Sequence, residues 1–183
     1  MELSNTQGEE ALKLWKSEII RFKEYLEKKF DVTITEDDIR EAIKVNNAGR
    51  RSLRKLYEVM KHDPVPICGH DLFKVLYGST FKFDRREIPA EVDALVEKIQ
   101  KEYAEGKMLE KMPRILFTGC PVGGATEKVI QAIESNGAVV VTYENCTGAK
   151  SIDKLVDEEN PDVYDALARR YLNIGCSVMT PNP

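Results

Sequence analysis

The residues from 113 to 183 constrain the fold most, because short apolar runs alternate there with turns that carry cysteine and glycine. The runs 114–118 and 138–143 are rich in β-branched and large apolar side chains, which is typical of strands buried on both faces by helices. A helix is expected between them, with Thr126 as its N-cap and Gly137 in its stop. The strand, helix, strand succession predicts a parallel α/β unit.

A further helix is expected over 163–172, and the run 174–179 predicts a third strand. The sequence stops where the next crossover helix would begin, which would leave an apolar face of a parallel sheet uncovered. We therefore expect a Rossmann-like α/β half-domain over 113–183, truncated at its end, and a chain that is a fragment of a longer polypeptide.

The first half of the chain is expected to be helical, as a linker and packing region over 1–112. Apolar residues recur every three or four positions, which indicates amphipathic helices. One covers 8–29, with Trp15 on its apolar seam, and a second starts after the N-cap Thr35 and ends before Pro64. A short helix over 71–77 and another that opens at Pro89 and stops at Gly106 complete the region.

The middle of the second helix carries the polar residues Asn46, Asn47, Arg50 and Arg51. Two interpretations are open. These side chains form hydrogen bonds with a neighbouring domain or subunit, or they form a solvated helix face of little energetic consequence.

Composition narrows the classes of partner. The net charge is −4 and the pI is about 5.4. A nucleic acid or an anionic membrane as the main partner would favour a basic surface, so small molecules and proteins remain. No apolar run approaches the roughly 20 residues that span a bilayer, and the N-terminus has no apolar signal-peptide core, so a cytoplasmic location is expected.

Two turns at predicted strand ends carry the residues that could bind a metal or another ligand. Cys146 follows the second strand, where a thiolate could bind a soft metal or an iron–sulfur cluster, or could be a buried thiol. Cys68, Cys120 and Cys176 are the other cysteines, and no CxxC pair occurs.

The first turn contains Gly119, Gly123 and Gly124, followed by Thr126. Glycines permit a close backbone approach, and the next helix would offer free amides to an anion such as that of an acyl-CoA. The alternative is a structural turn, since the spacing matches neither a dinucleotide fingerprint nor a Walker motif.

Three segments carry a family resemblance: PRILFTGCPV from Pro113, VVVTYENCTG from Val139 and ARRYLNIGCSVMTPNP from Ala168. The chain resembles the D-component family of 2-hydroxyacyl-CoA dehydratases and benzoyl-CoA reductases, and the ENCTG and IGC pieces are similar to its double-cubane cluster branch. The helical half is similar to the segment that joins the family's two α/β lobes.

The resemblance implies an oxygen-sensitive iron–sulfur protein of anaerobic metabolism, with a [4Fe–4S] or double-cubane cluster in the complete protein. It implies an acyl-CoA or other small-molecule substrate, an ATP-dependent iron–sulfur activator protein, and a homo- or heterodimer. Cys146, Cys120 and Cys176 are the expected ligands. The family's other cluster cysteines come from an N-terminal lobe and a later strand end that this sequence lacks.

The main expected function is radical dehydration of an acyl-CoA, and two alternative functions of different kinds are open. The first is a double-cubane reductase of small molecules. The second is a non-catalytic docking or assembly subunit, whose Trp15 seam binds a cluster-bearing partner. A third and simpler hypothesis is that the chain is a Rossmann-like protein that binds a phosphate-bearing ligand at residues 119–126.

Overall fold

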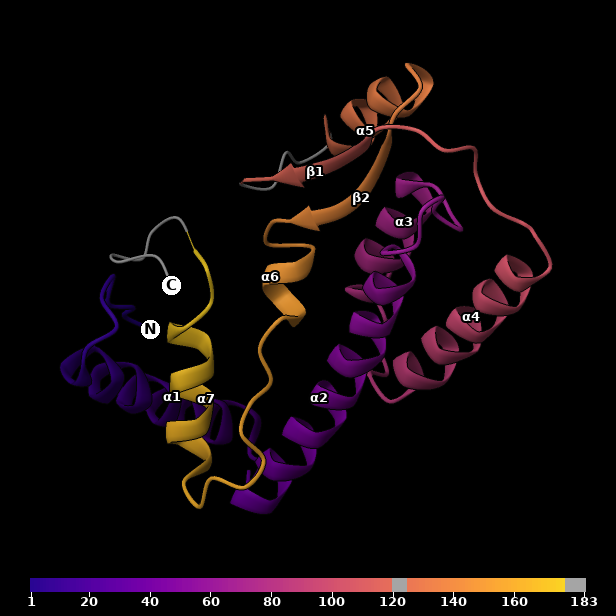
Figure 1. The fold of residues 1–183 in the computed structure, drawn as a ribbon. Coiled ribbons are helices and arrows are strands. Elements are labelled where there is room, and N and C mark those ends of the chain that lie inside the picture. The colour runs from indigo at the N-terminus through magenta and orange to yellow at the C-terminus, as the bar shows by residue number, and fades with distance from the viewer. Residues whose placement is uncertain (120–124, 177–183) are drawn as a thin grey trace. The chain divides into compact units, whose positions relative to one another are not determined.

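The computed structural model describes residues 1–119 and 125–176, which form helices and a small parallel sheet (Figure 1). The elements are α1 (Glu9–Phe30), α2 (Glu36–Val59), α3 (Gly69–Ser79), α4 (Glu87–Ala104), β1 (Arg114–Thr118), α5 (Ala125–Ser135), β2 (Val139–Glu144), α6 (Ala149–Ile152) and α7 (Val163–Leu172). The predicted fold class is confirmed: helices dominate the first half, and parallel strands lie in the second.

Local sequence signals explain where several elements begin. Thr35 caps α2 as predicted, because its hydroxyl accepts the Asp38 N–H at 3.1 Å while the Asp38 carboxylate accepts the Thr35 N–H at 2.8 Å. The helix α7 occupies the predicted residues, and its N-cap Asp162 accepts two backbone N–H groups. Thr126 is a correction: α5 begins at Ala125, so Thr126 is a buried residue of the first turn and not the cap. The one-turn helix α6 was not predicted.

The sheet of the described residues has two parallel strands, with Arg114 opposite Val139 and Thr118 opposite Glu144. The prediction that both faces of each strand are buried is wrong for β1, because the Leu116 side chain is 55% exposed. In contrast, β2 contacts β1, α3, α5 and α6, and it is largely buried. Residues 174–176 are not in a strand, and the rest of the predicted third strand lies outside the described residues.

The chain divides into two compact units. One consists of Met1–Asn47 with the described residues from Lys154 onward, and the other comprises the described residues of Ala48–Asp153. This division rests on packing contacts, so the predicted boundary between 112 and 113 stays a prediction.

The 48–153 unit has the larger hydrophobic core. Apolar side chains from α2, α3 and α4 pack with those of both strands, α5 and α6. Fully buried members include Leu56, Met60, Leu72, Ile130 and Val140. Burial of each such side chain contributes about 1.5–3 kcal/mol, so this core positions the strand ends.

In the other unit, α1 packs on α7 through Ala11, Leu12, Ala168 and Leu172. The Trp15 seam predicted from periodicity contributes partly buried side chains to this contact. The proposal that the seam docks a partner stays a prediction.

The surroundings of Asn47 decide between the two interpretations of the polar residues of α2 for this one residue. Its side chain is fully buried, and its amide donates to Val156 O at 2.8 Å and accepts from Val156 N at 3.0 Å. The solvated-face interpretation is therefore wrong for Asn47, whose partner is a segment of its own unit. Asn46 and Arg51 are exposed, as that interpretation expects.

A single carboxylate joins three elements of the 48–153 unit. Glu134, at the end of α5, accepts the Gly69 N–H at 2.6 Å and the His70 N–H at 3.3 Å, both from the first turn of α3. It also accepts the Val140 N–H of β2 at 3.3 Å. A negative charge at a helix N-terminus is favourable, so Glu134 serves as a cap from outside the helix.

The approach of α3 to β2 requires glycine at position 69. A Cβ there would lie 2.3 Å from Val140 O and 2.6 Å from Val140 Cβ. Tyr143 fixes the same contact, since its hydroxyl donates to Gly69 O at 2.8 Å.

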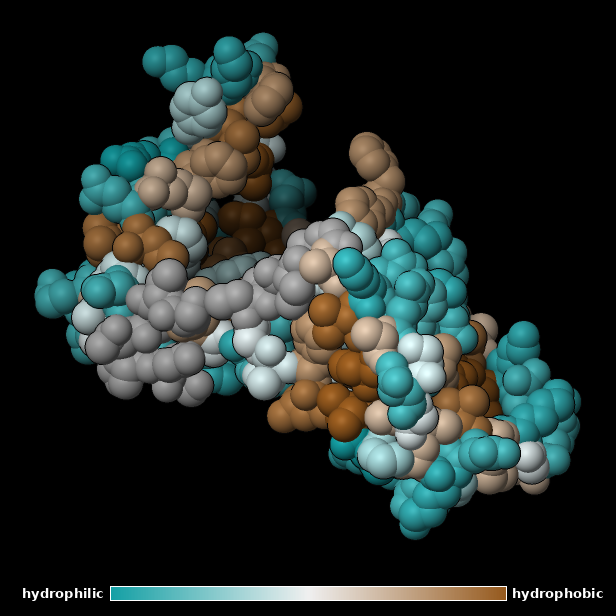
Figure 2. Space-filling view, turned by 90° about the horizontal axis from the view of Figure 1, so that it is seen from above, coloured by the Kyte–Doolittle hydropathy of each residue, from teal (hydrophilic) through white to brown (hydrophobic). Residues whose placement is uncertain are grey.

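The surface is mixed in character. Figure 2 shows a face on which hydrophobic residues gather in patches between hydrophilic ones. Large apolar side chains that stay exposed include Leu116, Phe81 and Phe83. In the described ranges, no helix combines the length and apolar character that crossing a membrane requires.

Candidate functional site

The carboxyl ends of β1 and β2 lie side by side, because the strands are parallel and Thr118 pairs with Glu144. Two further contacts join the ends. Gly119 N donates to Glu144 O at 3.2 Å, and the Thr118 hydroxyl donates to the Glu144 carboxylate. Ligands of open parallel sheets bind beyond this edge, so the loops that start here form the candidate site.

The loop after β2 presents Cys146 to solvent on a tightly bonded turn. Its neighbour Asn145 is 1% exposed, and the Asn145 side-chain oxygen accepts from Thr147 N at 3.2 Å and from the Thr147 hydroxyl at 3.0 Å. Gly148 N then donates to Asn145 O at 3.1 Å. An exposed thiol between residues that are fixed by these bonds is suited to reach a metal ion without reorganising the loop.

Gly148 allows this turn to lie close to the strand that precedes it. A Cβ at this position would lie 2.1 Å from Tyr143 O, 2.7 Å from Tyr143 Cβ and 2.9 Å from the Tyr57 hydroxyl. The Tyr57 hydroxyl itself donates to Tyr143 O at 3.2 Å. Glycine is thus required by close packing, and α2 supports the loop through Tyr57.

Glu144 places a carboxylate at the end of β2, opposite Thr118 of β1. The Thr118 hydroxyl, aided by the Lys150 ammonium, holds the pKa of the Glu144 carboxyl below its usual range, although burial opposes this effect. Lys150 Nζ lies 3.2 Å from a Glu144 oxygen. An ionised, paired carboxylate is suited to hold the two loops together, and it is poorly suited to donate a proton.

The first predicted turn is only partly described. Gly119 has φ of +113°, a conformation that favours glycine, so its identity has a backbone reason. Thr126 lies in α5, buried. Cys120, Gly123 and Gly124 lie outside the described residues.

The other described thiols occupy different surroundings. Cys176 belongs to the unit formed by the chain's two end segments, where it packs half-buried against the contact of α1 with α7. Cys68 lies just before α3. Burial, together with the charges of Asp71 and Glu134, raises the pKa of the Cys68 thiol. The free Cys68 thiol is therefore protonated at neutral pH.

Sequence reasoning missed three supports of the Cys146 loop: Lys150, Tyr57 and the glycine requirement at 148. Lys150 follows the cysteine by four residues, within a short turn that periodicity does not reveal. Tyr57 is 89 positions from Cys146, so no local pattern connects the two. His70 is also paired, since its Nε2 lies 2.7 Å from a Glu127 carboxylate oxygen.

A cubane needs several thiolates, and the described residues offer a single exposed one in the 48–153 unit. Within 1–119 and 125–176, no three side chains of His, Cys, Asp or Glu gather closely enough to hold a metal ion. Cys146 is an exposed thiol at a strand end, and the described residues alone do not form a complete cluster site.

An α/β chain with a cysteine turn at the end of a parallel strand is the arrangement that the sequence resemblance implies. The chain belongs to the 2-hydroxyglutaryl-CoA dehydratase D-component family, whose model matches residues 1–183.

A similar curated protein is "Putative dehydratase subunit YjiM" of Escherichia coli (strain K12), which is 46% identical over 183 residues. The match covers 100% of this chain and 48% of the relative, so the chain spans about half the length of that protein.

Proposed function

We propose that the protein containing this chain is a dehydratase-type component that removes water from a 2-hydroxyacyl-CoA, and that Cys146 supplies one thiolate to its iron–sulfur cluster. The family membership and the similarity to a dehydratase subunit support the reaction class. The observation that carries the residue assignment is the exposure of Cys146 on a turn fixed by Asn145, Thr147 and Gly148 at a strand end.

The role of this chain's own residues is to present and orient that thiolate. Asn145 uses its side-chain oxygen inside the turn, and Gly148 lets the turn pack on Tyr143. Glu144, ionised and paired with Lys150, ties the end of β2 to Thr118 of β1. When bound, an iron–sulfur cluster would supply the low-potential single electron, received from an ATP-dependent activator, that elimination of the hydroxyl requires.

Further ligands and contacts are proposed on the resemblance alone. Cys120 and Cys176 are the next thiols to test. The Gly119 turn, with Gly123, Gly124 and Thr126, is the proposed contact for an acyl-CoA anion, and the positive φ of Gly119 is consistent with a close backbone approach there.

The test is the iron and acid-labile sulfide content of the complete protein, purified without oxygen, in wild-type, Cys146→Ala and Cys68→Ala forms. We expect about four irons per subunit for a cubane or about eight for a double cubane. The Cys146→Ala variant should lose much of its iron, and Cys68→Ala should retain it because Cys68 is a protonated, half-buried thiol.

Unchanged iron in Cys146→Ala would remove this residue from the ligand set. Absence of iron from the wild-type protein would refute the cluster assignment as a whole. A matching activity assay supplies a 2-hydroxyacyl-CoA, activator, ATP and reductant. Dehydration supports the proposed reaction, whereas iron without dehydration would favour the reductase branch or a docking subunit.

A further inference from the structure

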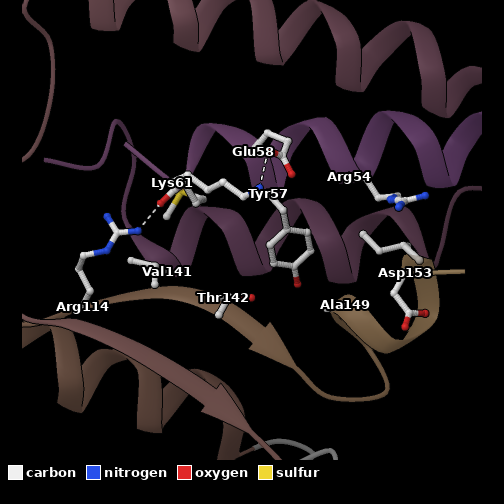
Figure 3. A pocket seen from close by; sticks show the side chains of 11 residues that line it. Arg54, Tyr57, Glu58, Lys61, Arg114, Val141, Thr142, Ala149 and Asp153 are labelled. Carbon is white, nitrogen blue, oxygen red and sulfur yellow. Dashed lines mark hydrogen bonds and ion pairs between the residues drawn. The ribbon is translucent and has the colours of Figure 1, made fainter. Parts of the chain in front are cut away.

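A second candidate site lies in the 48–153 unit, between α2 on one side and β2 with α6 on the other. It is a groove of about 410 Å³ (Figure 3). Its wall is mainly apolar, formed by Met60, Val141, Ala149 and Ile152 with the ring of Tyr57 in the middle. A concave apolar surface of this size with a few charged groups at its margins is typical of small-molecule sites.

The charges of the groove favour an anion, although the whole chain is acidic. Three cations line it, and two carboxylates accompany them. Lys61 and Glu58 neutralise each other at 2.6 Å. Arg114 donates to the carbonyls of Met60 and His62 at 2.8 and 2.6 Å, so its hydrogen bonds leave the positive charge uncompensated.

Arg54 is the cation best placed to bind a ligand. Its guanidinium makes no hydrogen bond or ion pair with any residue in the described part of the chain. Figure 3 places it at the opposite end of the groove from Arg114, with Tyr57 between them. Asp153 lies at the Arg54 end, and no ion pair joins the two side chains.

We infer that this groove binds an organic anion, with its acidic group on Arg54 and its apolar body against Tyr57, Val141 and Ile152. The inference is independent of the iron–sulfur proposal, because none of its residues is a proposed cluster ligand. The planar guanidinium of Arg54 suits a carboxylate, sulfonate or phosphate, which it can bind through two parallel hydrogen bonds.

The test uses the complete protein and two fluorescent probes of similar shape. One is the anion 8-anilinonaphthalene-1-sulfonate, and the other is the neutral N-phenyl-1-naphthylamine. Arg54→Gln should weaken binding of the anion about fivefold, the effect of one exposed charge contact, and leave the neutral probe unchanged. Arg86→Gln is the matched control, since Arg86 is an exposed arginine outside the groove that pairs with Asp84.

Two more variants distinguish the contribution of charge to probe binding from the contribution of the shape of the groove. Asp153→Asn should strengthen binding of the anion severalfold, because it removes a like charge from the Arg54 end. Ala149→Phe fills the groove from its wall and should weaken both probes. Circular dichroism melting of each variant checks that the fold persists.

Equal affinity of the anion for wild type and a folded Arg54→Gln variant would overturn the inference. Failure of the wild-type protein to bind the anion saturably would also overturn it, as would happen if another segment of the longer protein occupies the groove.

Discussion

Replacing Gly148 by alanine should destabilise the chain markedly, because the added methyl has no free space. It would lie 2.1 Å from Tyr143 O and 2.7 Å from Tyr143 Cβ, and Tyr143 is a buried residue near the end of β2. Overpacking of this kind costs about 1–3 kcal/mol. The added Cβ would also lie 2.9 Å from the Tyr57 hydroxyl and displace it, and loss of its hydrogen bond to Tyr143 O adds about 1 kcal/mol.

The sum is roughly 3 kcal/mol, and for chains of 150–250 residues each kcal/mol lowers Tm by about 2–4 °C. Thermal unfolding followed by circular dichroism should therefore show a Tm lower by about 6–12 °C. Gly78→Ala is the matched control: Gly78 lies in α3, nothing lies within 4 Å of its added Cβ, and alanine favours helix by about 1 kcal/mol.

A Tm of Gly148→Ala within about 2 °C of wild type would refute the close-packing explanation. Equal losses in Gly148→Ala and Gly78→Ala would do so too, since they would show a general effect of glycine replacement.

Two further changes test the polar contacts. Asn47→Ala should cost about 2–3 kcal/mol, because it leaves a buried backbone N–H and C=O without partners, whereas Asn46→Ala on the exposed face should cost under 1 kcal/mol in the same melting experiment. The pKa of Glu144 is lowered by the Thr118 hydroxyl and by Lys150, so its stabilising effect is complete above the unfolded carboxyl pKa of about 4.3 and is lost as pH falls through the lower folded value. Carboxyl NMR titration should show that pKa rise in Lys150→Met; an unchanged value would exclude Lys150 as a cause.

Helices and strands were largely predictable because their signals are local. The apolar spacing of α1, α2 and α7 and the compact runs of β1 and β2 lie within single short windows of sequence. The cysteine turn after β2 was found for the same reason, since a strand end followed by Asn145, Cys146 and Gly148 is contiguous.

The rest depends on contacts between distant residues. No sequence neighbour of Asn47 indicates that its side chain forms hydrogen bonds with Val156 rather than with water. Likewise, no sequence neighbour of Gly148 indicates that the Tyr57 hydroxyl lies close to it. The exposure of Leu116 likewise depends on which elements cover β1, a property of the assembled fold that β-branched composition does not encode.

The carboxylate of Glu134 has a consequence for any attempt to recombine this family's parts. It belongs to α5, yet its partners are the first residues of α3 and one residue of β2. A chimera that exchanges α5 with a relative, or grafts α3 into another scaffold, would separate an acceptor from its three donors. The interchangeable module is therefore α3, α5 and β2 as a set, even though 45 residues of sequence separate the end of the first from the start of the second.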